Sequence, residues 1–196
     1  MSKLKTRTIL EIWKFFLLIN KHLKQGKSDP EIFRQILQEF SQTNKITHWR
    51  KEVSVGRIDP DASLADAIKI CNFHLVSPEI NEENVLWQKE SGKGAEIYEF
   101  DFPYPMTTLQ IRKHLLAMKI EEPSILYLLA VSLIYHNVSD LYPLISLGTT
   151  WKDKSGNSMS PCFNIIDGRR ILFGKKANDH TVWPVGYHFL GIKVEK

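Results

Sequence analysis

Two short runs of apolar and β-branched residues flank the dipeptide Asp167-Gly168. Asp-Gly is favoured in two-residue hairpin loops, because both loop positions need a left-handed backbone. The sequence therefore predicts a hairpin with strands at 162–166 and 169–173, in which Ile166 lies opposite Arg169. Since side chains alternate across a strand, this register places Phe163, Ile165, Arg170 and Leu172 on one face and Asn164, Arg169 and Ile171 on the other.

The rest of the carboxy-terminal third has the composition of further strands. Residues 144–151 predict a strand, residues 154–157 a turn and residues 182–194 a final strand. Pro184 places the start of the final strand at a sheet edge, because proline cannot donate to the hydrogen-bond ladder. Together these segments predict a β-meander over 144–194.

Helical patterns dominate residues 1–80. Apolar residues spaced three and four apart predict amphipathic helices over 8–24 and 30–42. Residues 44–61 are irregular and predict turns. A shorter helix over 63–72 then begins at the capping residue Ser63.

The central part of the chain combines a hairpin with two helices. Alternating residues on both sides of the loop 91–94 predict a hairpin over 85–102. Thr107 and Gln110 form a capping box, which begins the first helix of a predicted helical region over 107–137. Its second helix, over 123–136, has almost no polar face, so we expect it at the centre of the domain.

This order of elements predicts a single α+β domain over 1–196, with amino-terminal and central helices packed on one side of an antiparallel sheet. A chain of 196 residues with 43% hydrophobic content is large enough to bury a core without disulfides. The apolar runs at 9–19 and 125–135 are shorter than the ~20 residues of a membrane-spanning helix, so no membrane association is expected. The two cysteines are far apart and match no disulfide framework, which favours a cytoplasmic protein with reduced thiols.

Motifs for cofactors and metals are not found in the sequence. Ser91-Gly92-Lys93-Gly94 joins two predicted strands, without the following helix that would align amides on a phosphate. None of the seven histidines falls in a zinc-ligand spacing. The sequence therefore predicts no cofactor and no metal site.

Charge is distributed unevenly along the chain. Lys plus Arg against Asp plus Glu number 11 against 4 in residues 1–51, 7 against 14 in 52–151, and 8 against 4 in 152–196. The basic ends either dock on the acidic middle within one fold or form a surface for a polyanion. The candidate nucleic-acid-binding residues are Lys152, Lys154, Arg169, Arg170, Lys175, Lys176 and Trp183. Basic residues beside aromatic ones can hold a phosphate backbone while bases stack.

Two enzymatic alternatives remain open. Cys162 with His180 or His188 contains the residue types of a cysteine hydrolase, although a cysteine within a strand is more often a packed apolar residue. A metal-dependent nuclease would instead use carboxylates near the first hairpin, with Lys89 assisting. These carboxylates are Glu90, Glu96, Glu99 and Asp101. Alternation places Glu99 and Asp101 on the solvent side of their strand, which is the simpler interpretation.

The sequence as a whole predicts a non-enzymatic binding module for nucleic acid or another polyanion, with a hydrolase as the alternative. A third hypothesis is that the protein is a component of a protein assembly or forms a homo-oligomer. Its exposed apolar surface would come from Trp13, Phe15 and Phe16, or from the edge strand that begins at Val182.

Overall fold

The computed structural model describes residues 47–53, 58, 62–87, 95–135 and 141–194. The chain divides into two compact units, Met1–Lys45 and Ile46–Lys196, and every described residue belongs to the second. The helices predicted over 8–24 and 30–42 lie outside the described residues. The single domain over 1–196 stays a prediction.

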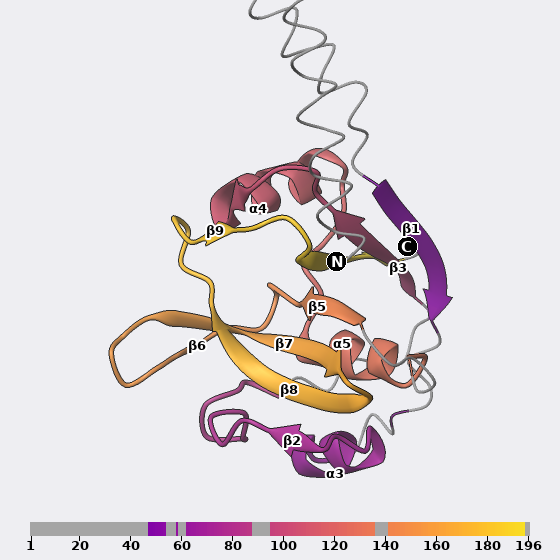
Figure 1. The fold of residues 1–196 in the computed structure, drawn as a ribbon, viewed down its shortest axis with the longest axis vertical. Helices are drawn as coiled ribbons and strands as arrows, with labels where there is room; N and C mark the ends of the chain where they lie inside the picture. The colour runs from indigo at the N-terminus through magenta and orange to yellow at the C-terminus, as the bar shows by residue number, and fades with distance from the viewer. Residues whose placement is uncertain (1–46, 54–57, 59–61, 88–94, 136–140, 195–196) are drawn as a thin grey trace, which may run out of the picture. The chain divides into compact units, whose positions relative to one another are not determined.

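Ten strands and three helices make up the described part of the chain (Figure 1). The strands are β1 Thr47–Val53, β2 Leu75–Val76, β3 Ala95–Asp101, β4 Met106–Thr107, β5 Leu141–Ile145, β6 Trp151–Lys152, β7 Ser158–Ile166, β8 Arg169–Lys176, β9 Val182–Trp183 and β10 His188–Val194. The helices are α3 Leu64–Ile70, α4 Thr108–Ala117 and α5 Ile125–Ser132. The predicted combination of helices with a mainly antiparallel sheet is confirmed at this level.

Eight of the described strands form one mixed sheet, in the order β1-β3-β10-β5-β7-β8-β2, with β6 paired to β7. Most neighbours are antiparallel, but β10 runs parallel to β5, and β2 runs parallel to β8. The predicted meander is wrong in its last step, because β10 lies between β3 and β5 and not beside β8. After β8 the chain first forms β9, which pairs with β4 in a separate two-stranded sheet.

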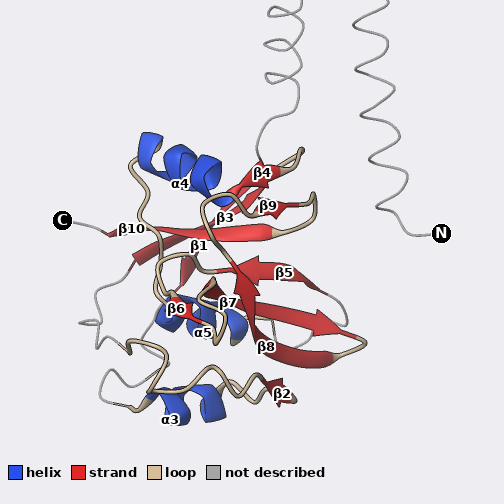
Figure 2. Ribbon diagram, turned by 90° about the vertical axis from the view of Figure 1, so that its left-hand side faces the viewer, coloured by secondary structure: helices blue, strands red, loops and turns tan. Residues whose placement is uncertain are grey.

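Helices lie on both faces of the large sheet (Figure 2), and each face carries an apolar cluster. On one face α3 and α5 pack with strand residues, so that Leu128 and Phe163 belong to one apolar cluster. On the other face α4 contributes Leu115 to a second cluster, which contains Phe189. The prediction that the helices lie on one side of the sheet is therefore wrong. Phe189 and its neighbour Leu190 point to opposite faces, and both are buried.

The hairpin around Asp167-Gly168 is confirmed. Ile166 pairs with Arg169, and Phe163 pairs with Leu172, as predicted. The φ angles of Asp167 and Gly168 are 48° and 73°. This is the left-handed pair that a two-residue type I′ loop requires.

The first predicted hairpin, over 85–102, is wrong in its pairing, although its second strand is present as β3. The Asn81 side chain accepts hydrogen bonds from the backbone N–H groups of Glu83 and Asn84, both at 3.0 Å. The resulting turn carries Val85 into the core and leaves no strand at 85–87. The partners of β3 are instead β10 and β1, and β1 lies in a region for which the sequence predicts turns.

Two predicted strands are interrupted. The strand predicted over 144–151 stops after β5, because the hydroxyl groups that follow bind the start of α5. Ser146 Oγ donates to the carbonyl of Pro123 at 2.5 Å, and Thr149 Oγ1 accepts from the backbone N–H of Ile125 at 2.8 Å. The strand predicted over 182–194 separates into β9 and β10, with Pro184 directly after β9.

The predicted starts of two helices are confirmed by their side-chain caps. Ser63 Oγ accepts from the backbone N–H of Asp66 at 3.1 Å at the start of α3. At the start of α4, Thr107 Oγ1 accepts from the backbone N–H of Gln110 at 3.2 Å, and Gln110 Oε1 accepts from that of Thr107 at 2.8 Å. The eight residues of α5 are all buried, as its apolar pattern predicts.

We expect Thr107→Ala to lower the free energy of unfolding by about 1 kcal/mol, since it removes the acceptor that caps α4. Urea denaturation followed by tryptophan fluorescence measures this change. Thr107→Ser keeps the hydroxyl group and is the matched control, with an expected change under about 0.5 kcal/mol. Equal losses in the two variants would show that the methyl group and not the cap stabilises this region.

Candidate functional site

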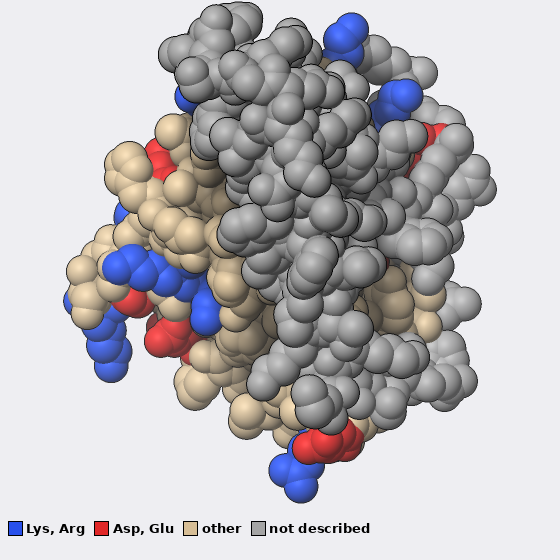
Figure 3. Space-filling model, turned by 45° about the horizontal axis from the view of Figure 1, so that its top comes forward, with Lys and Arg blue, Asp and Glu red and all other residues tan. Residues whose placement is uncertain are grey.

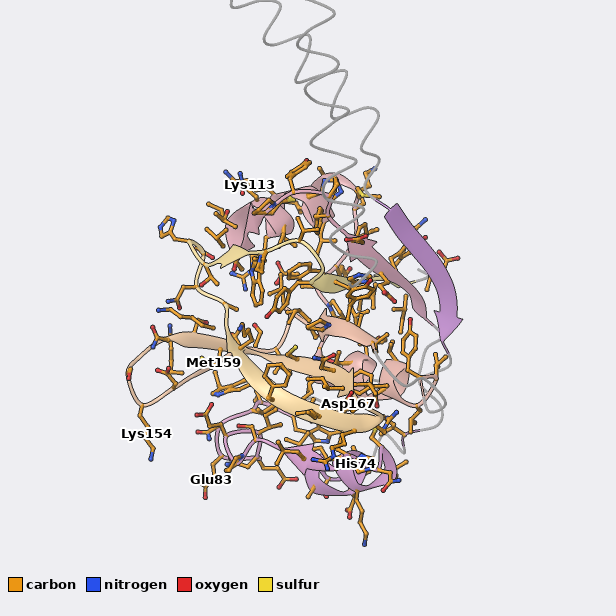
Figure 4. The ribbon with its side chains drawn as sticks, in the orientation of Figure 1. His74, Glu83, Lys113, Lys154, Met159 and Asp167 are labelled. Atoms are coloured by element: carbon orange, nitrogen blue, oxygen red, sulfur yellow. The ribbon has the colours of Figure 1, made fainter. Side chains whose placement is uncertain are left out.

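The predicted basic residues separate into two groups on the β7–β8 hairpin. Arg169 begins β8 beside the hairpin loop, whereas Lys175 and Lys176 end the same strand. Lys175 lies six positions after Arg169 along the strand, which corresponds to roughly 20 Å. Figure 4 shows Lys154 and Asp167 at opposite ends of the β7–β8 ribbon. The seven predicted binding residues therefore do not form one surface.

Arg170 lies inside the protein and is 7% exposed. Its guanidinium donates to three backbone carbonyls, those of Cys71 at 3.2 Å, Ser132 at 2.8 Å and Tyr135 at 3.2 Å. The Cζ atom also lies 5.4 Å from the ring centroid of Phe73 and 5.2 Å from that of Phe163. Burial lowers the pKa of Arg170. The expectation that this side chain contributes to an exposed basic face is corrected by this geometry.

The acceptors of Arg170 explain why a cation is buried here. Cys71 is the carboxy-terminal cap of α3, and Ser132 is the last residue of α5. The last carbonyls of a helix have no partner within the helix, and they carry the negative end of the helix dipole. One guanidinium thus satisfies the ends of two helices, which makes Arg170 a structural residue.

Trp183 is also buried, with 2% of its surface exposed. Its Nε1–H donates to Thr108 Oγ1 at 2.9 Å, and its ring packs edge-on against Phe189 with a centroid distance of 5.3 Å. A ring that is enclosed in this way offers no face to a nucleic-acid base. The predicted stacking residue therefore belongs to the core below α4.

Four lysines remain together at one end of the ribbon, and we name this group the lysine end: Lys152, Lys154, Lys175 and Lys176. Three of them are exposed, and Lys175 is half-buried with Nζ 5.6 Å from the ring centroid of Tyr187. In the observed register Lys152 shares a sheet face with Lys175, while Lys176 points to the opposite face. Lys154 lies in the turn between β6 and β7.

Two acidic side chains lie near the lysine end: Asp153 in the connection after β6, and Glu79 beside Gly174. The carboxylate of Asp153 accepts from the side chain of Asn157 at 2.9 Å and from the backbone N–H groups of Ser155 and Asn157, both at 2.8 Å. The hydrogen bond from the Asn157 side chain is the main reason that the pKa of Asp153 is lowered, and Lys176 adds to the effect. Among the residues that the structure describes, none of the four lysines has an ion-pair partner within 4.0 Å. On the face drawn in Figure 3, acidic side chains lie beside the basic ones at the left edge.

The cysteine hydrolase alternative is contradicted by the sheet register. Cys162 pairs with Ile145, which in turn pairs with Phe189, so these three side chains point to the same face. His188 precedes Phe189 in β10 and points to the other face. Burial raises the pKa of the Cys162 thiol, which keeps it protonated and unreactive. His180 is exposed, whereas Cys162 has no exposed surface.

The carboxylates of the nuclease alternative do not converge. Glu90 and Lys89 lie outside the described residues, and Glu96 points to the face of β3 opposite to that of Glu99 and Asp101. Glu96 accepts from the hydroxyl of Tyr98 at 2.7 Å. Within the described ranges, no group of three or more His, Cys, Asp or Glu side chains is arranged to hold a metal ion.

A polar cluster that the sequence does not reveal surrounds Glu99, and we name it the Glu99 cluster: Glu99, Tyr135, Tyr142 and His188. The side chain of Glu99 is 15% exposed, so its predicted place on the solvent side is wrong. Its Oε1 lies 2.5 Å from His188 Nδ1, and its Oε2 accepts from the hydroxyl of Tyr135 at 2.8 Å. Burial, followed by the charge of Glu99, raises the pKa of Tyr135. The cluster depends on the pairing of β3 with β10, for which the sequence contains no local signal.

A groove of about 480 Å³ runs along α4. Its apolar lining includes Leu109, Leu116 and Ile120. Of its two basic residues, Lys113 is exposed, and Arg112 is engaged, with Nε 3.2 Å from Glu122 and NH1 2.9 Å from Asp179. The groove therefore offers apolar contact but no free arginine for an anionic ligand.

The sequence matches no protein-family model, and no significant match is found among curated proteins or solved structures. None of the helices in the described part of the chain has the length and apolar character that a membrane crossing requires. The lysine end and the Glu99 cluster are the two candidate sites among the described residues.

Proposed function

We propose that the protein is a binding module that holds a polyanion, such as a nucleic acid, at the lysine end. The observation that carries this proposal is the set of four ammonium groups that form no ion pair within 4.0 Å among the described residues. Ammonium groups bind phosphates as point charges, and they gain affinity by releasing the counterions condensed on the polyanion. Such binding requires no chemical step and no recognition of bases.

The arrangement of the lysines favours a flexible polyanion over a rigid one. Lys152 and Lys175 lie on one face of the ribbon, Lys176 lies on the other, and Lys154 lies in the adjoining turn. A single strand can wrap around this end and reach all four, whereas a straight duplex reaches one face. Tyr187 adds little stacking, because Lys175 covers its ring and Trp183 packs against it with a centroid distance of 5.5 Å.

We expect a fluorescently labelled single-stranded oligonucleotide to bind the full chain with a log–log salt dependence of slope about −3, as four phosphate contacts predict. Fluorescence anisotropy across a salt series measures the slope. Replacing Lys175 and Lys176 with serine should reduce its magnitude by about 1.5 and weaken binding at low salt. Because a straight duplex reaches one face of this end, we expect a duplex of the same length to show a smaller slope than the single strand, even with the unmodified protein.

The matched control replaces Lys69 and Lys119 with serine, because both are exposed lysines outside the lysine end. This double variant has the same net charge as the Lys175 and Lys176 variant, so it separates position from total charge. Equal effects of the two double variants would refute the assignment to the lysine end. No detectable binding at low salt by any nucleic acid or by heparin would refute polyanion binding itself.

A further inference from the structure

The Glu99 cluster holds a histidine in one orientation. Nδ1 of His188 lies 2.5 Å from Glu99 Oε1, and the imidazole ring stacks on Tyr142 with a centroid distance of 4.9 Å and an interplanar angle of 9°. The side chain of His188 is 11% exposed, and Tyr142 is 46% exposed, so the stacked pair reaches the surface. Asp101, which is directly opposite His188 in the register, lies on the same face.

The hydrogen-bond partners determine which ring nitrogen carries the proton. A carboxylate only accepts, so His188 donates its Nδ1–H to Glu99. The neutral ring then has its lone pair on Nε2, for which the described residues supply no hydrogen-bond partner. A carboxylate on Nδ1 orients an imidazole and stabilises the cation that forms when Nε2 takes up a proton.

We propose that His188 and Glu99 form a proton-transfer pair that activates a hydroxyl group or a water molecule at Nε2. The O–H proton moves to Nε2, its bonding electrons stay on the oxygen, and the charge of the imidazolium is offset by the Glu99 carboxylate. Cys162 takes no part, because it points to the other face of the sheet. This inference goes beyond the binding function proposed above, since it places a chemical step at a site other than the lysine end.

His74 provides an internal comparison. Its Nδ1 accepts a hydrogen bond from the backbone N–H of Arg170 at 3.1 Å, so its neutral ring carries the proton on Nε2. Long-range ¹H–¹⁵N correlation spectra of the neutral rings should therefore show the Nδ1–H form at His188 and the Nε2–H form at His74. An Nε2–H form at His188 would overturn the proposal.

Diethyl pyrocarbonate tests whether the Nε2 lone pair is reactive. The Nε2 lone pair attacks a carbonyl carbon of the reagent, and the N–C bond forms while the anhydride C–O bond breaks. The leaving ethyl carbonate takes up the proton released from Nδ1 and gives ethanol and carbon dioxide. Peptide mapping by mass spectrometry should show modification of His188 in the folded protein despite its burial. We expect Glu99→Gln to slow this modification about tenfold, while the exposed His180 reacts at an unchanged rate.

Two outcomes oppose the proposal. Modification of His180 and His74 without modification of His188 would mean that Nε2 is closed to reagents and that the cluster is structural. An unchanged rate at His188 in folded Glu99→Gln would mean that the carboxylate does not position the ring. Circular dichroism of the variant establishes that it is folded, and the spectra of the unmodified protein test the proton position independently of any substitution.

Discussion

Arg170→Met lowers the free energy of unfolding by about 4 kcal/mol in our expectation. Three backbone carbonyls lose their donor, and a buried acceptor without a partner costs about 1–3 kcal/mol. The lost contacts with Phe73 and Phe163 add to this cost, although the methionine side chain refills part of the volume. Urea denaturation followed by fluorescence measures the change.

Two further variants separate this role from simple loss of charge. Arg169→Met removes the same charge from the neighbouring exposed position, and it should change stability by less than about 0.5 kcal/mol. Arg170→Lys keeps the charge, but one ammonium cannot reach the carbonyls of Cys71, Ser132 and Tyr135 in the same way, so about half of the loss should remain. If the free energy of unfolding of Arg170→Met lies within about 1 kcal/mol of that of the unmodified protein, the proposed capping of α3 and α5 is incorrect.

The position of Arg170 could be predicted in part from the sequence. The Asp167-Gly168 loop fixes the register of β7 and β8, and this register places Arg170 on the same face as Phe163 and Leu172. A cation on an apolar face indicates either a binding surface or a buried cap. The sequence cannot distinguish them, because the carbonyls that Arg170 binds come from α3 and α5, which are distant in the chain.

The elements that could be predicted are those whose signals are local. The caps at Ser63 and Thr107 and the apolar character of α5 depend on residues within a few positions of one another. The partner strands of β3 lie far from it in the chain, about fifty residues before it and ninety residues after it. Alternation in β3 indicates two faces but not what covers them, so Glu99 was expected in solvent, and its contact with His188 could not be foreseen.

The two candidate sites depend on different parts of the sheet, which makes them separable. The lysine end needs β6 and the ends of β7 and β8, whereas the Glu99 cluster needs β3 and β10 to be neighbours. Lys175 and Lys176 variants should therefore leave the reactivity of His188 unchanged. Glu99→Gln should likewise leave the binding of an oligonucleotide unchanged, because Glu99 lies on neither β6, β7 nor β8.

Gly148→Ala has the second large effect that we expect, a loss of about 3 kcal/mol in the free energy of unfolding. A Cβ atom at this position would lie 2.5 Å from the carbonyl oxygen of Pro123 and still closer to that of Glu122. Neither is the end of a flexible side chain, so the backbone segments must move apart. This movement weakens the hydrogen bond from Gly148 N–H to Pro123 O, now 3.0 Å, and that from Ile125 N–H to Thr149. Overpacking of this kind typically costs about 1–3 kcal/mol before the hydrogen bonds are counted.

The control for this steric effect is Gly168→Ala in the hairpin loop. A Cβ atom at Gly168 meets nothing within 4 Å, but the φ angle of 73° is left-handed, so the cost is backbone strain of about 1 kcal/mol. Urea denaturation of the two variants compares steric overlap with strain in the same protein. A loss at Gly148 no greater than that at Gly168 would mean that the segment 146–149 yields easily. The start of α5 would then be held by its apolar side chains rather than by the hydroxyl groups of Ser146 and Thr149.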